Sequence, residues 1–412
     1  MQRLPLSYYV YRLLMSLISP ILLIWIWQTT KKKPSLRANR LGGLDQPINA
    51  DIWIHCASVG EVNAVMPLIS ELISRDKKVV LSCFTPTGLA QAERRLLEID
   101  AGSRVSCFLL PVDWQWTIHR LLKQLHVSEL WLVETELWPT LIVNAKQYGI
   151  RLKLINGRLS PKTLTAPKWW RNLLAHLVTY YIGTCLLRSE QDKAYYTQLG
   201  VMPEQLQVTG NLKLCDTLTT TLKRLYQQPY IVFASTHDPE EQRLAHLWQK
   251  HPTLPKLVIV PRHPNRGTQI AKTLASDGIL YSQRSQHPEQ YKGVIIADTF
   301  GELLSWMAHS ELVIMGGSFV LKGGQNPIEA TRLGKYVITG PDMHDFVDEN
   351  LALMQVGSLM QVAEINEDMI AQIKMLLKQP ELISQKGQAG QAWLLQMQQQ
   401  VMNKTCLALF PS

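Results

Sequence analysis

The chain has 412 residues, of which 46% are hydrophobic and 18% charged, and its formal net charge is +9 at pH 7. This length predicts two to three domains, and the composition excludes wholesale disorder, a fibrous repeat and a small disulfide-stapled module. Seven of the 42 basic residues lie in the first 40 positions, where no acidic residue occurs, which leaves 35 basic against 33 acidic residues elsewhere and argues against a nucleic-acid-binding surface on a folded domain.

An apolar segment near the amino terminus predicts membrane attachment. Residues 13–27 are almost wholly apolar, and a basic flank follows at Lys31, Lys32, Lys33, Arg37 and Arg40. About 20 residues are needed to cross the hydrocarbon core, so we expect either a marginal span counted from Tyr8 or a helix lying in the interface. A cleaved signal peptide is disfavoured because the small-residue cleavage site is missing. The basic flank predicts that the folded body faces the cytoplasm.

Two series of short β-branched runs alternate with helical patterns, and this alternation predicts two doubly wound α/β domains with parallel sheets. The first series lies at 52–56, 79–84, 105–110, 130–133 and 152–155, and the second at 230–234, 257–260, 294–297, 312–315 and 336–339. A polar stretch between Leu212 and Pro229 marks the join. We therefore expect an anchor with its basic flank at 1–35, one domain at 36–220 and another at 221–412. Ligands of such sheets lie beyond the carboxyl ends of the strands, in a cleft where the two domains face each other.

The first strand runs into Ser58, Gly60 and Glu61 at the entrance of the next helix. Ser58 and Glu61 have the spacing of a capping box, which is a structural role. A carboxylate beside the cleft can also accept a proton from an acceptor hydroxyl. From the pattern alone, the capping role is the stronger of the two.

Two carboxylates, Glu134 and Glu136, follow the fourth strand directly. Their position at a strand terminus, followed at once by Trp and Pro, favours a functional role over a solvated surface. After the fifth strand come Arg158 and Lys162, and then basic residues interleaved with tryptophan at 168–171. This strip is either a surface for headgroups or phosphorylated lipid, or an ordinary amphipathic loop and helix.

Three segments of the second domain could hold an anion. The first runs from Ser235 and Thr236 to Glu241, with Asp, Pro and Glu ordered as in an anion-binding helix entrance. The second holds Arg262 and His263 between prolines, and arginine suits bidentate contact with phosphate. The third is glycine-rich, which permits close backbone approach to a ligand and offers helix-entrance amides to phosphate. Its candidates are Gly316, Gly317, Ser318, Gln325, Asn326 and Glu329, of which Asn326 and Glu329 also fit helix-capping positions.

The collinear order of these motifs resembles one family, the 3-deoxy-D-manno-octulosonic acid (Kdo) transferases of lipopolysaccharide assembly. The likeness covers most of the chain. In chain order the motifs are SVGE at 58–61, ETELWP at 134–139, NGRLS at 156–160, GNLK at 210–213, STH at 235–237, PRHP at 261–264, GEL at 301–303, GGS at 316–318 and GGQNPIE at 323–329. The resemblance implies a GT-B glycosyltransferase architecture, anchored to the inner membrane with its body in the cytoplasm.

The resemblance also implies CMP-Kdo as donor, a phosphorylated and acylated glucosamine disaccharide precursor of lipid A (lipid IVA) as acceptor, and no metal or other cofactor. Glu61 is then the base that deprotonates an acceptor hydroxyl as it attacks Kdo with inversion. Donor binding is expected at Ser235, Thr236, Arg262, His263, Gly316, Gly317, Ser318, Gln325, Asn326 and Glu329. Of these, Arg262, Ser318 and the amides near Asn326 are expected to stabilise the leaving phosphate, and Glu329 to touch the ribose. The acceptor side is expected at Ser58, Gly60, Glu134, Glu136, Arg158 and Lys162.

Two positions depart from the family pattern. Gln325 stands where relatives commonly have histidine, so it supplies at most a hydrogen bond. Asp216 lies three residues beyond Lys213 rather than two, and its role is left open. Two other functions stay open as alternatives: another nucleotide-sugar transferase or epimerase of the same architecture, and a catalytically silent membrane scaffold.

Overall fold

The computed structural model describes residues 4–31, 34–99, 101–216, 221–286 and 291–410, so Lys32 and Lys33 of the expected basic flank lie outside the described residues. The chain forms two compact units, Met1–Thr219 with Gln398–Ser412, and Thr220–Met397. We expected residues 221–412 to form one domain. Instead, the last turns of α17 (Pro380–Leu409) belong to the first unit, because Val401 and Leu409 are buried in its core.

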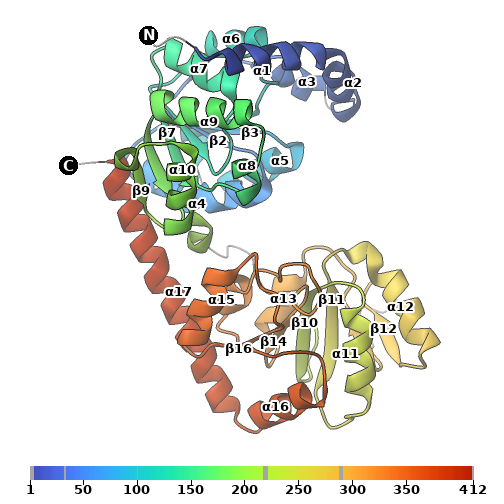
Figure 1. The fold of residues 1–412 in the computed structure, drawn as a ribbon. Coiled ribbons are helices and arrows are strands. Elements are labelled where there is room, and N and C mark those ends of the chain that lie inside the picture. Colours follow the sequence, from blue (N-terminus) through green and yellow to red (C-terminus); the bar gives the residue numbers. More distant parts are fainter. Residues whose placement is uncertain (1–3, 32–33, 100, 217–220, 287–290, 411–412) are drawn as a thin grey trace. The chain divides into compact units, whose positions relative to one another are not determined.

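The first unit is built on a parallel sheet with strand order β4-β3-β2-β6-β7-β8-β9 (Figure 1). The strands are β2 (Ile52–Cys56), β3 (Val79–Cys83), β4 (Val105–Leu109), β6 (Glu129–Val133), β7 (Arg151–Gly157), β8 (Ile182–Leu187) and β9 (Leu206–Val208), with a separate pair formed by β1 (Ile48–Asn49) and β5 (Leu125–His126). All five predicted strands of this domain are present. The strands β8 and β9 were not predicted; β8 follows helix α9 without an intervening turn, so no breaker residue marks its start.

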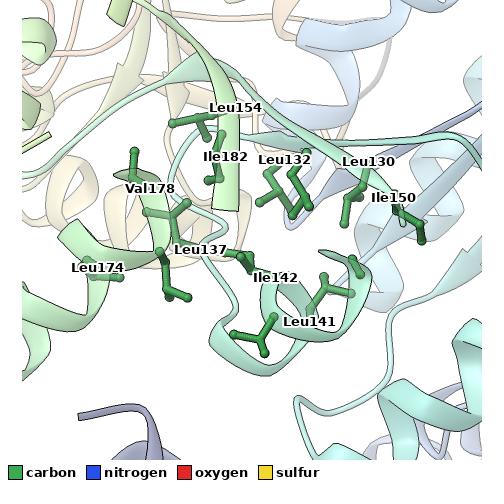
Figure 2. Packing of buried hydrophobic residues seen from close by; sticks show 14 of the residues in the cluster. Leu130, Leu132, Leu137, Leu141, Ile142, Ile150, Leu154, Leu174, Val178 and Ile182 are labelled. Atoms are coloured by element: carbon green, nitrogen blue, oxygen red, sulfur yellow. The ribbon is translucent and has the colours of Figure 1, made fainter. Parts of the chain in front are cut away.

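Helices cover both faces of this sheet, which is why its central strands are buried and mostly apolar. They are α4 (Val59–Ser74), α5 (Pro86–Glu98), α6 (Gln115–Leu122), α7 (Pro139–Gln147), α8 (Pro161–Leu164), α9 (Lys168–Tyr181) and α10 (Glu190–Leu199), with short 3-10 helices at Gly102–Arg104, Pro203–Gln205 and Leu212–Cys215. Side chains of β6 alternate between two cores. Leu130 and Leu132 pack with α7 and α9 (Figure 2), whereas Trp131 and Val133 pack with α4 and α5.

The second unit repeats the plan with a parallel sheet of order β12-β13-β11-β10-β14-β15-β16. Its strands are β10 (Tyr230–Thr236), β11 (Lys256–Pro261), β12 (Tyr281–Gln283), β13 (Val294–Ile296), β14 (Val313–Met315), β15 (Val337–Thr339) and β16 (Leu359–Gln361). Its helices are α11 (Glu240–Gln249), α12 (Gly267–Ser276), α13 (Leu303–Ala308), α14 (Ile328–Arg332), α15 (Val347–Gln355) and α16 (Glu367–Leu377), with a 3-10 helix at Pro264–Arg266. The five predicted strands are again present, and the short edge strands β12 and β16 are additional.

The amino-terminal segment forms three helices, α1 (Leu6–Leu17), α2 (Ser19–Thr29) and α3 (Pro34–Arg40). The expected single anchor helix is therefore wrong: the chain breaks at Ile18, and α1 and α2 are bent by 57°. Pro20 accounts for the break, because proline has no N–H to donate and its ring clashes with the preceding helical turn. Among the described helices none is by itself long and apolar enough to cross a bilayer, whereas α1 and α2 together reach that length and composition.

Candidate functional site

Glu61 lies in the first turn of α4, just beyond the carboxyl end of β2. Its Oε2 accepts a 2.6 Å hydrogen bond from the N–H of Ala57, and its Oε1 accepts a 2.9 Å bond from the hydroxyl of Ser58. The Ser58 hydroxyl oxygen accepts in turn from the Glu61 N–H at 3.4 Å. The predicted capping role is thus confirmed, with the carboxylate reaching one residue further back than the cap. Each carboxylate oxygen has two acceptor positions, so these bonds leave half of the acceptor capacity unused.

The environment of Glu61 disfavours its charged form. The residue is 7% exposed, and its pKa is raised to about 7, mainly by burial and further by the negative charges of Glu136 and Glu134, against the lowering effect of the bonds from Ala57 and Ser58. A carboxyl group with a pKa near neutrality is suited to accept a proton at physiological pH.

The chain turns directly after β6, and this turn brings Glu134 and Glu136 close enough to Glu61 to raise its pKa. Glu134 has a left-handed backbone with φ +57°, and the N–H of Glu136 donates to the oxygen of Val133 at 3.3 Å. Glu134 is buried and Glu136 is half-buried, so the predicted acceptor-side carboxylates form one acidic cluster with the capping site.

Lys213 is the cation of this cluster, and it was not among the predicted site residues. Its Nζ lies 2.7 Å from Glu134 Oε1, which also accepts from the Asn156 amide at 3.3 Å. Asn156 places the lysine as well, since its Oδ1 accepts from the N–H of Leu212 at 2.9 Å. Lys213 belongs to the GNLK motif noted in the sequence, but the spacing of that motif does not predict an ion pair with Glu134. Asp216, left open above, forms a 3.0 Å ion pair with Arg95.

A second set of contacts connects Glu136 to the amino-terminal helices. Glu136 Oε2 accepts a 2.8 Å bond from the indole N–H of Trp138 and lies 3.6 Å from Nε2 of the buried His55. The ring of Trp138 packs on Phe84 with centroids 4.8 Å apart, and Phe84 stacks on Trp25 of α2 at 6.3 Å. A continuous row of aromatic side chains thus runs from the acidic cluster to α2.

The remaining acceptor-side candidates lie at the surface. Arg158 and Lys162 are exposed. The strip at 168–171 begins α9, an amphipathic helix whose buried face includes Leu173 and Leu177, and this leaves both alternatives for the strip open. A role of this strip in binding headgroups stays a prediction. Gly60 has no atom closer than 4.0 Å to the position of an added Cβ, so nothing crowds the backbone beside Glu61.

In the second unit, a protein carboxylate lies at the entrance of α11, where the sequence predicted an anion site. The helix begins at Glu240, and the Glu240 carboxylate, itself fully buried, accepts from the N–H groups of His237 at 2.8 Å, Gly317 at 2.8 Å and Phe319 at 3.0 Å. Burial raises the pKa of this carboxyl group. The amide of Gly317, predicted to hold a phosphate, is therefore used by a protein carboxylate that sequence reasoning did not single out.

In the GGS segment (316–318) and at the end of β10, polar groups are likewise buried and bonded to other groups of the protein. The Ser318 hydroxyl is fully buried, donates to the oxygen of Met315 at 2.6 Å and accepts from the N–H of Gly340 at 2.8 Å. A Cβ on Gly316 would lie 2.6 Å from the Cα of Thr236, so this glycine serves close packing. Ser235 and Thr236 are themselves buried, and Thr236 donates to Glu241. The structure therefore corrects the expectation that Ser318 supports the leaving phosphate.

The other donor-side candidates remain accessible. Arg262 and His263 are exposed after β11, whereas Gln325, Asn326 and Glu329 are half-buried. Gln325 Nε2 lies 3.3 Å from Nε2 of His237, and the rings of His237 and His263 are 6.5 Å apart. Asn326 caps α14 by accepting from the Ile328 N–H at 3.1 Å. The sequence motif STH contained His237, whose pKa is lowered by burial and by the charge of Arg266, but His237 was not chosen as a candidate.

Comparison with known proteins assigns the fold and the family. Residues 29–215 match the family model described as 3-deoxy-D-manno-octulosonic-acid transferase (kdotransferase). The 3-deoxy-D-manno-octulosonic acid transferase of Haemophilus influenzae is 30% identical over 416 residues, covering 94% of this chain and 95% of that protein. The protein of the same name from Bordetella pertussis is 28% identical over 408 residues, covering 93% and 94%.

Among solved structures, the UDP-GlcNAc 2-epimerase of Neisseria meningitidis matches with a TM-score of 0.57 and 14% identity, covering 86% of this chain and 99% of that one. At this identity the likeness bears on the fold alone, and it confirms the GT-B type predicted for the two α/β units. The Haemophilus relative is similar over nearly the full length of both proteins, and on that ground the chain belongs to the 3-deoxy-D-manno-octulosonic acid transferase family.

Proposed function

We propose that this protein transfers Kdo from CMP-Kdo to lipid IVA with inversion at the anomeric carbon. Family membership supports Kdo transfer in lipopolysaccharide synthesis. The proposed chemistry rests on one observation: the carboxyl group of Glu61 is oriented by hydrogen bonds from Ala57 and Ser58, and its pKa is raised to about 7.

The reaction is a single displacement in which Glu61 accepts the proton of an acceptor hydroxyl. The acceptor oxygen forms a bond to the anomeric carbon of Kdo while the bond to the phosphate of CMP breaks, and CMP leaves with the electron pair. Attack from the face opposite the leaving group inverts the configuration. Because Glu61 becomes neutral, the negative charge beside Glu134 and Glu136 falls during the step, and this relief favours proton transfer.

The leaving phosphate requires fixed donors. Arg262 is the candidate that the structure leaves available, since its side chain is exposed and guanidinium pairs bidentately with phosphate. His263 and the pair of Gln325 and His237 lie nearby in the second unit. Metal independence is part of this proposal, and turnover unchanged by a chelator is the expected result.

Attachment to the cytoplasmic face of the inner membrane is also proposed. Its support is the apolar surface of α1 and α2, where Leu6 and Ile21 are 79% and 68% exposed. Such a location brings a water-soluble donor to a lipid-borne acceptor.

The test is transfer by the purified protein from labelled CMP-Kdo to lipid IVA in detergent, with product mass and anomeric configuration determined. We expect transfer with inversion, and its loss in Glu61→Gln. Glu71→Gln is the matched control, since Glu71 lies on the same helix, at the surface, paired with Arg75. Turnover of a UDP-sugar without Kdo transfer would favour the epimerase or another transferase, and absence of any turnover in every variant would favour the scaffold.

A further inference from the structure

We infer that α1 and α2 lie in the plane of the membrane without crossing it, and that their outer face docks the first unit on an anionic phospholipid bilayer. The inference rests on the membrane location proposed above and decides between the two arrangements that the sequence left open. It is carried by the contacts on the inner side of the two helices and by the chemistry of their outer side.

The inner side of α1 is built into the first unit. Tyr8 and Tyr11 are 1% and 8% exposed, and the Tyr11 hydroxyl donates to Asp113 Oδ2 at 2.8 Å. Asp113 is itself buried and accepts from the N–H groups of Thr140 and Leu141 at the start of α7, both at 2.8 Å. Detaching α1 would leave this buried carboxylate short of a donor, which is costly in an apolar interior.

The inner side of α2 is held in the same way. Ile26 is 2% exposed in a cluster with Val112 and Trp114, and the indole N–H of the same Trp114 donates to the oxygen of Met15 in α1 at 3.1 Å. Trp25 stacks on Phe84 with an angle of 16° between the rings. The bend between α1 and α2 lets both helices follow the surface of the same unit, as Figure 1 shows for α1 beside α6 and α7.

These contacts are incompatible with a span. A helix from Tyr8 to Ile26 would be about 27 Å long at 1.5 Å per residue, close to the thickness of the hydrocarbon core. In a spanning arrangement one of these two residues would lie near the far interface. Both are buried against the same folded unit, so both belong to the same side of the membrane.

The outer side of the pair is apolar and exposed. The residues concerned are Leu6, Leu13, Leu17, Ile21, Ile24 and Trp27, each more than half exposed. An apolar surface of this kind marks an interaction site, and a helix with one lipid-facing side is the form that interfacial anchors take.

Charge identifies the bilayer as the partner. No acidic residue occurs in α1, α2 or α3, whereas Arg12 and Lys31 are exposed beside the apolar face. A cavity of about 620 Å³ between the pair and the body is lined by apolar and uncharged polar side chains together with Arg12, His119 and Asp113, and Asp113 is already bonded to Tyr11. Cations beside apolar surface are complementary to anionic headgroups over acyl chains.

Topology is tested in cells with two full-length variants, one carrying a short hydrophilic tag with a reactive cysteine before Met1, the other carrying it after Ser412. We expect both tags to resist a membrane-impermeant maleimide when only the outer membrane is permeabilised, and both to react once the inner membrane is opened. Reaction of the amino-terminal tag alone in the first condition would overturn the inference. Recovery of the protein in the soluble fraction would overturn the membrane location itself, while Kdo transfer in detergent is measured separately.

The docking face is tested with the double variant Leu13→Asp/Ile21→Asp on vesicles of phosphatidylglycerol and phosphatidylcholine. We expect the vesicle-bound fraction to fall at least tenfold, with the melting temperature unchanged because both side chains are exposed. The matched control is Leu407→Asp, a 73% exposed leucine at the end of α17, which should bind as the wild type does. Equal binding of the double variant and the wild type, or binding independent of phosphatidylglycerol, would refute the docking face.

Discussion

Glu61→Gln separates the structural role of this residue from its chemical one. A glutamine oxygen can accept from the Ala57 N–H and its amide can donate to Ser58, so the helix cap is kept. Glutamine cannot take up a proton. If Glu61 is the general base, turnover falls about 10²- to 10⁴-fold, and kcat/KM of the wild type rises with pH through about 7, because the free carboxylate is the active form.

Glu61 also affects how stability depends on pH. The effect has the opposite direction to that on activity, since the free energy of unfolding of the wild type should fall as pH rises. In the folded protein the pKa of Glu61 is about 7, whereas the ordinary pKa of a glutamate carboxyl group is 4.5. Between these values the folded state binds more protons, so the free energy of unfolding falls as pH rises. A difference of about 2.5 pKa units at 1.36 kcal/mol each corresponds to about 3 kcal/mol. In the Glu61→Gln variant the free energy of unfolding should not show this fall between acid and alkaline pH, because glutamine does not titrate.

The assay combines kcat/KM against pH with urea unfolding on the acidic and alkaline sides of this range. Glu71→Gln, on the same helix, should match the wild type in both. Turnover of the Glu61→Gln protein within twofold of the wild type would remove Glu61 from catalysis. If the unfolding free energy of the variant still falls with pH as that of the wild type does, the titrating group is a residue other than Glu61.

Three further substitutions test the surrounding contacts. Lys213→Met leaves Glu134 without its cation, so the apparent pKa in the kcat/KM profile should move above that of the wild type; an unchanged profile would contradict the electrostatic link. Glu240→Ala leaves the buried N–H of Gly317 and the part-buried N–H groups of His237 and Phe319 without their acceptor. It should cost about 3 kcal/mol of unfolding free energy and weaken CMP binding in calorimetry, whereas unaltered CMP affinity would separate Glu240 from the donor site. Tyr11→Phe removes a donor from buried Asp113 and should lower stability by about 1–3 kcal/mol, seen as a lower melting temperature; no change would mean that α1 is not fastened there.

The strands at the centre of each sheet were predictable because their signal is local. Both faces of a parallel sheet are covered by helices, so runs such as 130–133 and 230–234 are apolar without interruption. The edge strands β12 and β16, with the sequences YSQ and LMQ, contain polar residues and so show no apolar run. The capping box was also predictable from local sequence, because Ser58 and Glu61 are only three positions apart in the chain.

The assignments that failed depended on distant partners. Ser318 and Gly317 look like phosphate ligands in a glycine-rich segment, but the hydroxyl and the amide are taken by Gly340, Met315 and Glu240. The apolar amino terminus likewise looked like one helix, whereas its proline divides it and its aromatic residues pack on the body.

The two α/β units, the helix cap at Glu61 and the family could be predicted from the chain, because periodicity, spacing and motif order are local or linear properties. Which polar groups remain available for chemistry could not be predicted, because it depends on how distant segments pack. The pairing of Lys213 with Glu134, the occupation of the Gly317 amide by Glu240 and the anchoring of Tyr11 on Asp113 each join segments far apart in the chain. Burial and hydrogen bonding arise only when those segments pack together, and both set the pKa of Glu61.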